Sequence, residues 1–521
     1  MTTSSYDDVL YPSYVHPQTH PDRLATLATL FGMQPAAVPS ARILELACGQ
    51  GGNLIPIANC YPDSKCLGID LSERQITQGQ QVVAALGLTN IELRAQSILD
   101  FPSAEGKFDY IIAHGVFSWV PENVRDKILQ ICRDHLAPQG VAIVSYNTFP
   151  GWHQRRMIRD MMRFHTKAFT DPQKRIEQAR AFLTFMTKAV PNDSAYGRSL
   201  HEEFRSLTNV DEAYIFHEQL EEVNEPKYFH EFADQAAAHG LQYLSEVELS
   251  NLQLERYPQP VAQVLAKMPV VEREQYLDFL LRRTFRQTLL CHNEVVLDRT
   301  NLGDRAGTLR VASPLLINRP ADEIHSDQPL VLEGQGGARL HIRDRLTKTA
   351  FALMAQAWPH SIAISDLQSE VRRSLAGGTM VQSEAEFARD SQSLAHSLVH
   401  AFIAGAVHMY STPPRFAEKL SESPRACSLA RYQANLGNRV TNRQHSSITL
   451  DPLSCQLLTC LDGSTDRATM LEALVRFVVD QKIALQKDGH VVTSTEEIRS
   501  LLGEQLEPSL NNLRRQALLV D

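Results

Sequence analysis

The sequence has few cysteines, no long apolar run and no excess of basic residues. Only eight cysteines occur in 521 residues, without the paired CxxC spacing of zinc sites or a disulfide framework, so we predict no metal. No apolar run approaches the roughly 20 residues of a membrane helix, so no membrane insertion is expected. The opening "MTTSSYDDVLYPSY" lacks the basic and apolar segments of a secretory signal. We therefore expect a cytoplasmic protein.

Charge and length narrow the classes further. Lysine and arginine number 51 against 60 acidic residues, a net charge of −9, which argues against a surface that binds nucleic acid throughout. Hydrophobic residues make up 43% and charged residues 21% of the chain, as in ordinary globular proteins. This length predicts three or four domains.

Residues 42 to 146 alternate strand and helix patterns. The strand-like runs are "RILELA", "KCLGID", "IELRA", "FDYIIA" and "VAIVSY". Between the second and third runs, Ser72 and Gln75 form a capping-box pattern, and Gly87 lies near the expected helix end. Pro121 opens another helix. Strands separated by helices predict an α/β fold with a doubly wound, Rossmann-like parallel sheet, in a domain of residues 1–155.

The rest of the chain is more helical. We expect residues 156–300 to form a helical region, interrupted by a helix and a strand in 225–256 that return to the first sheet, and helical again over 270–290. Residues 301–411 and 448–521 each suggest a winged-helix-like module. Between them, 412–447 is rich in Pro, Ser, Arg and Asn; a solvated linker is the main interpretation and a polyanion-binding arm the alternative.

The first strand runs into a glycine cluster, "ELACGQGGN". Glycines let the backbone approach a ligand outside the carboxyl ends of parallel strands. Asp70 follows Gly49 by 21 residues and ends the second strand, where a carboxylate can accept hydrogen bonds from both hydroxyls of a ribose. NAD and S-adenosylmethionine both contain that ribose. Gly49, Gly51 and Gly52 do not fit the GxGxxG spacing of dinucleotide sites.

This loop instead resembles motif I of the class I S-adenosylmethionine-dependent methyltransferases, (D/E)xGxGxG, with Ala47 in place of the first glycine. The resemblance implies S-adenosylmethionine as cofactor, S-adenosylhomocysteine as product, and Glu45 at the methionine end. The cofactor contacts we predict on this basis are Glu45, Ala47, Gly49, Gly51, Asn53, Asp70, Leu71, Gln96, Ser97, His114, Gln18 and His20.

A longer resemblance rests on "YPSYVHPQTHPDRL", "HGVFSWVP", "SYNTFPGW" and "FHEQLEEVNEPKYFHEFADQ". These segments are similar to a bacterial subfamily with a methyltransferase regulatory domain, which includes rickettsial-type lysine methyltransferases of outer-membrane proteins. The resemblance implies protein lysine N-methylation, a protein partner of that kind, and a regulatory or homodimer-forming role for the helical region. The alternatives are a small-molecule methyltransferase and a non-catalytic, S-adenosylmethionine-sensing regulator.

Four residues are candidates at the acceptor side. No (N/D/S)PP(Y/F) motif follows the fourth strand; His114 stands there, as a cofactor contact, a general base or a structural histidine. Trp119 could wall the methyl-transfer pocket or belong to the core. Tyr146 and Asn147, which end the fifth strand, border the acceptor pocket or satisfy a turn.

Residues before the first strand allow two interpretations. One is a lid over the cofactor, and the other is an ordinary capped helix that starts near Pro21. The lid would be formed by Tyr11, Tyr14, Gln18, Thr19 and His20.

Overall fold

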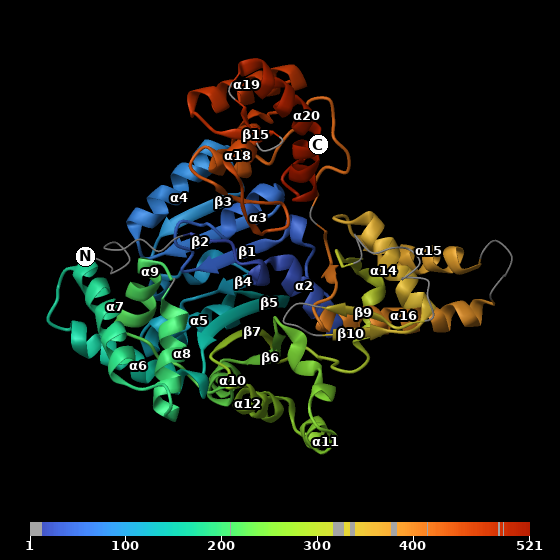
Figure 1. Cartoon of the computed structure of the whole chain (residues 1–521). Helices are drawn as coiled ribbons and strands as arrows, with labels where there is room; N and C mark the ends of the chain where they lie inside the picture. Colours follow the sequence, from blue (N-terminus) through green and yellow to red (C-terminus); the bar gives the residue numbers. More distant parts are fainter. Residues whose placement is uncertain are drawn as a thin grey trace.

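The computed structural model describes residues 13–208, 210–315, 328–333, 339–376, 383–413, 415–487, 490–492 and 494–520. Figure 1 shows a central sheet with helices on both faces, and separate groups of helices around it. The predicted Rossmann-like α/β domain is confirmed.

The central sheet has seven strands in the order β3-β2-β1-β4-β5-β7-β6. The first five are parallel, whereas β7 is antiparallel to both of its neighbours. The strands are β1 (Arg42–Leu46), β2 (Lys65–Asp70), β3 (Ile91–Ala95), β4 (Phe108–Ala113), β5 (Leu136–Asn147), β6 (Leu241–Glu246) and β7 (Phe285–His292). The carboxyl ends of β1, β2, β4 and β5 therefore meet at one edge, where ligands bind in such sheets.

Helices cover both faces of the sheet. Side chains of α2 (Pro21–Leu30), α3 (Leu54–Cys60) and α4 (Glu73–Leu86) share one core with one face. Those of α5 (Glu122–His135) and α10 (Phe229–Ala238) pack on the other. The predicted caps of α4 form: the Ser72 hydroxyl accepts from the Gln75 N–H, and Gly87 ends the helix in the left-handed region with φ 64°.

The prediction of helix over residues 270–290 is wrong in its second half. Helix α12 (Val270–Leu281) is present, but β7 follows and lies between β5 and β6. Its run "TLLCH" is buried without interruption because helices cover both faces of the strand. A short run with no polar alternation gives no period that separates a strand from a helix.

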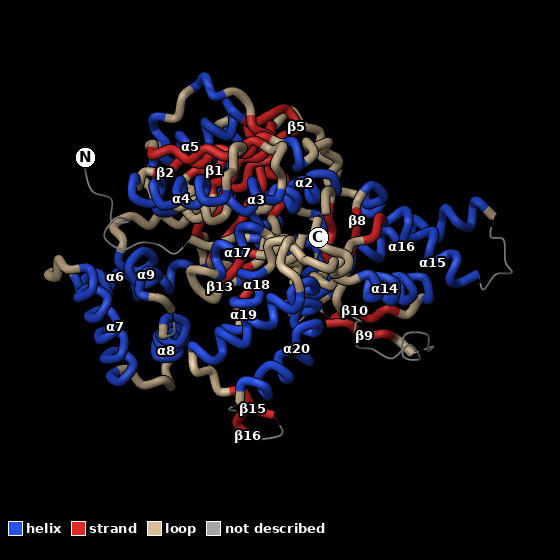
Figure 2. The backbone as a smooth tube through the Cα atoms, turned by 90° about the horizontal axis from the view of Figure 1, so that it is seen from above, coloured by secondary structure: helices blue, strands red, loops and turns tan. Residues whose placement is uncertain are grey.

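A helical insertion follows β5. It comprises α6 (Gly151–Thr166), α7 (Pro172–Ala189), α8 (Ala195–Leu207) and α9 (Glu212–Tyr214), and it has its own hydrophobic core. Both views place it beside the sheet (Figures 1 and 2). Helix α10 and strand β6 then return the chain to the sheet, and α11 (Gln259–Lys267) precedes α12.

The middle region pairs helices with small sheets. Strands β8 (Arg310–Ala312), β11 (Ile362–Ala363) and β12 (His408–Tyr410) form one sheet, and β9 (Leu330–Glu333) pairs with β10 (Arg339–Ile342). Helices α14 (Arg345–Ala357), α15 (Ile364–Ala376) and α16 (Glu384–Ile403) pack around them.

The C-terminal region reaches back to the sheet domain. Its elements are α17 (Ser428–Ala434), β13 (Arg439–Thr441), β14 (Ser447–Thr449), α18 (Pro452–Cys460), α19 (Arg467–Asp480), β15 (Leu485–Lys487), β16 (His490–Val492) and α20 (Thr495–Arg515). Helix α17 contacts α3 and α4, and Figure 2 shows it beneath them.

The interpretation of residues 412–447 as a solvated linker is therefore wrong for their second half. This segment forms α17 and β13, and Leu429, Ala430 and Val440 are buried. Its basic composition reflects an ordered surface, with apolar residues turned into the shared core.

Candidate functional site

The glycine loop after β1 lies at the carboxyl edge of the sheet. Gly49 and Gly51 have φ values of 55° and 75°, in the region that favours glycine. A Cβ atom on Gly49 would lie 2.9 Å from Oε1 of Gln75. Ala47 also has a positive φ, 58°. Alanine at position 47, where the motif usually has glycine, therefore differs from glycine in side-chain size and also in the cost of this left-handed backbone conformation.

Asp70 is joined to this loop from the end of β2. Its Oδ2 accepts a hydrogen bond of 2.9 Å from the Gly49 N–H, and its Oδ1 accepts one of 2.9 Å from the Ser72 N–H. The carboxylate thus fixes both the glycine loop and the start of α4. The adjacent candidate Leu71 exposes 67% of its surface, as a side chain that faces the solvent side of the loop.

Glu45 and Asn53 form the buried centre of the site. Asn53 Nδ2 donates 2.9 Å to Glu45 Oε1, and burial raises the pKa of Glu45 to about 8, with a lesser contribution from the Asp70 charge. Oε2 of Glu45 is buried without a hydrogen-bond partner among the described residues. A buried carboxyl oxygen in that state suits a cationic ligand group.

Residues 13–20 pass over the same site. The His16 N–H donates 3.0 Å to Asn53 Oδ1, and Asn53 Nδ2 donates 3.0 Å to the Thr19 hydroxyl. Gln18 lies half-buried in the turn Pro17–Thr19. The His20 Nδ1 accepts the Asp22 N–H as the cap of α2. The segment thus both crosses the site and caps the helix at Pro21, so features of both interpretations are present; Tyr11 lies outside the described residues.

Gln96 and Ser97 follow β3 and have local partners. The Gln96 amide donates to the Asp100 carbonyl, and the Ser97 hydroxyl accepts the Leu99 N–H. The Gln96 N–H also donates 2.8 Å to the Asp70 carbonyl, which ties this turn to the end of β2. Their predicted cofactor contacts stay predictions.

His114 lies between the N-terminal segment and β7. Its ring centroid is 4.4 Å from that of His16 and 6.1 Å from that of Phe285. Burial lowers its pKa to about 3, so it stays neutral at physiological pH and is a weak general base. Its Nδ1 is buried and has no hydrogen-bond partner among the described residues. This favours a ligand contact over proton abstraction.

Asn147 and two tryptophans lie at the end of β5. The rings of Trp119 and Trp152 are 6.3 Å apart and nearly perpendicular. The Ser118 hydroxyl accepts the Asn147 N–H at 2.9 Å, and the Ser118 carbonyl accepts the Glu225 N–H at 2.8 Å. These bonds bring Asn224 beside the same loop.

Unpartnered polar atoms gather at this end. Among the described residues, no partner is found for the buried side-chain amide nitrogens of Asn147 and Asn224, the Asn224 oxygen or the Trp152 indole nitrogen. Such atoms are rare in native structures, and a bound ligand is one explanation. Nothing in the sequence singled out Asn224 and Trp152, because their relevance depends on the insertion folding back.

The side chain of Tyr146 lies apart from these unpartnered polar atoms. It is 1% exposed, stacks on Phe232 of α10 with centroids 4.1 Å apart, and pairs its hydroxyl with that of Thr288 at 3.2 Å. Successive strand residues face opposite sides, so Tyr146 enters the core under α10 while Asn147 faces the other way. This burial favours a place in the core over one at the border of an acceptor pocket, and a site role for Tyr146 stays a prediction.

The residues at the carboxyl edge fit an S-adenosyl cofactor. Gly49 and Gly51 supply the positive φ values on which the loop depends, Asp70 offers oxygens at the end of β2, and Glu45 offers a buried carboxyl. Within the described ranges, no group of three or more His, Cys, Asp or Glu side chains could hold a metal ion.

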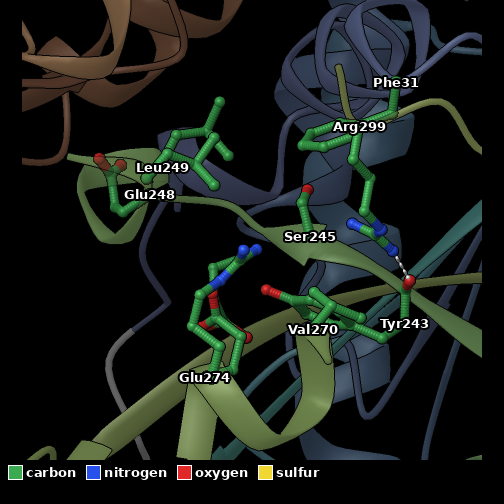
Figure 3. A pocket seen from close by; sticks show the side chains of 11 residues that line it. Phe31, Tyr243, Ser245, Glu248, Leu249, Val270, Glu274 and Arg299 are labelled. Atoms are coloured by element: carbon green, nitrogen blue, oxygen red, sulfur yellow. Dashed lines mark hydrogen bonds between the residues drawn. The ribbon is translucent and has the colours of Figure 1, made fainter. Parts of the chain in front are cut away.

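A separate pocket lies beside β6, the outermost strand on the far side of the sheet from β3. Figure 3 shows Arg299, which donates to the Tyr243 carbonyl, with Ser245 and Glu274 around the same space. It contains none of the predicted site residues.

Three family models match separate parts of the chain. Residues 43–140 match a methyltransferase domain, 211–292 a predicted methyltransferase regulatory domain, and 422–518 the PKMT C-terminal winged helix domain. The second range contains β6 and β7, so the regulatory match includes two strands of the central sheet.

Similar proteins cover nearly the whole chain. The uncharacterized protein RP789 of Rickettsia prowazekii is 34% identical over 524 residues, which is 99% of this chain and 93% of that protein. The structure of PKMT2 from Rickettsia typhi in complex with AdoHcy is 30% identical, with a TM-score of 0.84, over 98% of this chain and 100% of the other. A second structure of PKMT2 gives a TM-score of 0.87 at 29% identity.

Proposed function

The chain belongs to the S-adenosylmethionine-dependent class I methyltransferases that carry the methyltransferase regulatory domain and the PKMT winged helix domain, and we propose that it methylates lysine side chains of a protein. S-adenosylmethionine is the methyl donor. The single observation that supports a protein lysine as the methyl acceptor is the full-length similarity to PKMT2.

The cofactor supplies the methyl group on a sulfonium centre and leaves as S-adenosylhomocysteine. The chain must therefore position both reactants and exclude water. We assign Asp70 to the ribose hydroxyls and Glu45 to the amino group of the methionine end. The backbone of the glycine loop would lie against the cofactor. His16 and Thr19 hold Asn53, and through it Glu45.

We assign the acceptor lysine to the neighbourhood of His114, Trp119, Asn147 and Asn224. A lysine amine attacks only after its ammonium group gives its proton to solvent, and an aromatic, water-poor wall lowers the pKa of the amine. The unpartnered Asn224 Oδ1 can accept a hydrogen bond from the amine and so orient its lone pair. His114, with its pKa of about 3, contributes contact rather than proton transfer.

Incubation with tritiated S-adenosylmethionine tests the reaction. The purified protein is mixed with an outer-membrane fraction and, separately, with a cytosolic fraction of bacterial cells. Labelled ε-N-methyllysine in the acid hydrolysate of the protein fraction is expected, and it should be absent with Asp70→Ala. Label confined to small molecules would replace this proposal by small-molecule methylation. No label despite binding of S-adenosylhomocysteine would favour a non-catalytic regulator.

The partner and compartment are proposed from the same family resemblance. An outer-membrane protein is the proposed substrate, met in the cytoplasm before export, and a homodimer is the proposed assembly. Among the described residues, no helix has the length and apolar character to cross a bilayer. Stronger labelling of the outer-membrane fraction than of the cytosolic one would support this partner.

A further inference from the structure

We propose that His445, from the C-terminal region, is a positioning residue of the cofactor site that holds Glu45 through Asn53. His445 Nε2 lies 2.8 Å from Asn53 Oδ1, although the two residues are 392 positions apart. His445 is 4% exposed. The C-terminal winged helix domain would thereby complete the site that binds the methyl donor.

The hydrogen bonds of Asn53 fix its orientation. Its Oδ1 accepts from the His16 N–H and its Nδ2 donates to Glu45 and to Thr19. Because Oδ1 can only accept, His445 must present a protonated Nε2. All four hydrogen-bonding positions of the amide are then used, and loss of His445 leaves one acceptor position of a buried amide unfilled.

The loop that carries His445 is held firmly by the C-terminal region. Asn442 Nδ2 donates 2.9 Å to the Gln516 carbonyl, and the Arg443 N–H donates 2.9 Å to the Ala517 carbonyl, both just after α20. The His445 N–H in turn donates to the Asn442 carbonyl, and its φ is 56°. These bonds fix the backbone from which the imidazole reaches Asn53.

Further contacts join the C-terminal region to the sheet domain near the same point. The Cys427 thiol and the Ser428 hydroxyl both contact the side chain of Asn59 in α3. The Arg439 guanidinium lies 5.1 Å from the ring centroid of Tyr14. The rings of His20 and His445 are 5.0 Å apart. The imidazole therefore sits in a built interface, which includes the segment that crosses the cofactor site.

The reason to assign His445 to the cofactor is the state of Glu45. Asn53 restrains one carboxyl oxygen, and the other lacks a partner among the described residues. A restrained carboxyl keeps its second oxygen in place for a cationic ligand group, whereas a mobile one must be ordered on binding. Removal of His445 is thus expected to weaken cofactor binding more than it slows turnover.

The experiment compares His445→Ala and His445→Gln in the full-length protein, with His490→Ala as control, because His490 is exposed in β16 of the same region. Calorimetry measures the Kd of S-adenosylhomocysteine, and kinetics give KM for S-adenosylmethionine and kcat. For His445→Ala we expect Kd and KM about tenfold higher, with kcat within twofold. His445→Gln, which can still donate, should stay within threefold of the wild type.

Two further tests separate positioning from general folding. Imidazole added at tens of millimolar should restore most of the lost affinity of His445→Ala. In an Asn53→Ala background, His445→Ala should add no further loss, because the proposed route runs through Asn53. An unchanged Kd, a loss that neither imidazole nor glutamine recovers, or additive losses with Asn53→Ala would overturn the proposal.

A second pair of variants tests the proposal if His445→Ala does not fold. His445→Met and His445→Gln have similar volumes, but only glutamine can donate a hydrogen bond. Weaker cofactor binding by the methionine variant alone supports the proposal, and equal affinities overturn it. Because the Kd of S-adenosylhomocysteine is measured without a methyl acceptor, a wrong assignment of the lysine acceptor would leave the binding results unaffected.

Discussion

The Gly49 N–H donates a hydrogen bond of 2.9 Å to Oδ2 of Asp70, so the end of β2 fixes the glycine loop that follows β1. Asp70, which was predicted to contact the ribose, is thus also joined to the glycine loop. The glycine loop and the end of β2, which are the two parts of the expected nucleoside site, therefore depend on each other. A substitution at Asp70 acts on both.

Asp70→Ala should raise the Kd of S-adenosylhomocysteine by at least a hundredfold, since it removes the proposed ribose contacts and frees the Gly49 and Ser72 N–H groups. Glu73→Ala, at an exposed position in the first turn of α4, should leave the Kd unchanged. Calorimetry measures both. A wild-type Kd for Asp70→Ala would remove Asp70 from the ribose site.

Cofactor binding at pH 7 should release close to one proton from Glu45. With a pKa of about 8, about nine-tenths of this carboxyl is protonated before binding at that pH. A ligand ammonium group favours the carboxylate and lowers its pKa. Calorimetry in buffers of different ionisation enthalpy counts the protons, and Glu45→Gln should abolish the release. No buffer dependence in the wild type would argue against this pairing.

Ala47→Gly should stabilise the protein. A left-handed backbone conformation costs a residue other than glycine about 1–2 kcal/mol. Glycine avoids this cost, but its greater freedom in the unfolded chain offsets about 0.5–1 kcal/mol of the gain. The expected gain is about 0.5–1 kcal/mol, seen as a higher Tm. The control Ala41→Gly, where φ is −72°, should lower Tm instead. A lower Tm for both variants would show that the strain at Ala47 is negligible.

Tyr146→Phe should leave kcat and KM near those of the wild type. The hydroxyl contacts Thr288 inside the core, and its loss should cost about 1 kcal/mol of stability. Asn147→Ala should instead lower kcat with little change in Tm, because its amide nitrogen has no described partner to lose. Steady-state kinetics with a lysine-bearing substrate compare the two. A large fall in kcat for Tyr146→Phe would return this residue to the acceptor site.

The stability of the wild type should fall more steeply in acid than that of His445→Gln. Burial holds the pKa of His445 well below 6.5, so the folded protein keeps the ring neutral while the unfolded chain takes up a proton near pH 6.5. This contribution is therefore complete above pH 6.5 and is lost as pH falls, by up to about 1.4 kcal/mol per pH unit. Tm values between pH 7.5 and 5 should converge for the two proteins. Parallel curves would contradict a buried neutral His445.

Local sequence patterns predicted the sheet domain well where the residues that define a strand or helix lie close together in the sequence. Strands β1 to β5 follow apolar runs, and Ser72 and Gly87 cap α4 as expected. Strand β7 was missed because a run buried on both faces carries no period, and its neighbours in the sheet lie far away in the sequence. The basic segment 412–447 was misread for a related reason, since its apolar partners belong to distant helices.

The sequence by itself determined strands β1 to β5, the glycine loop and the places of Glu45 and Asp70 at strand ends, because each follows from a local apolar run or a short motif. Only the tertiary structure decided that Tyr146 enters the core under α10 while Asn147 faces the opposite side of the sheet, since one step along a strand reverses the side chain. It alone brought His445 to Asn53, because a hydrogen bond across 392 residues depends on how whole domains pack and leaves no local pattern.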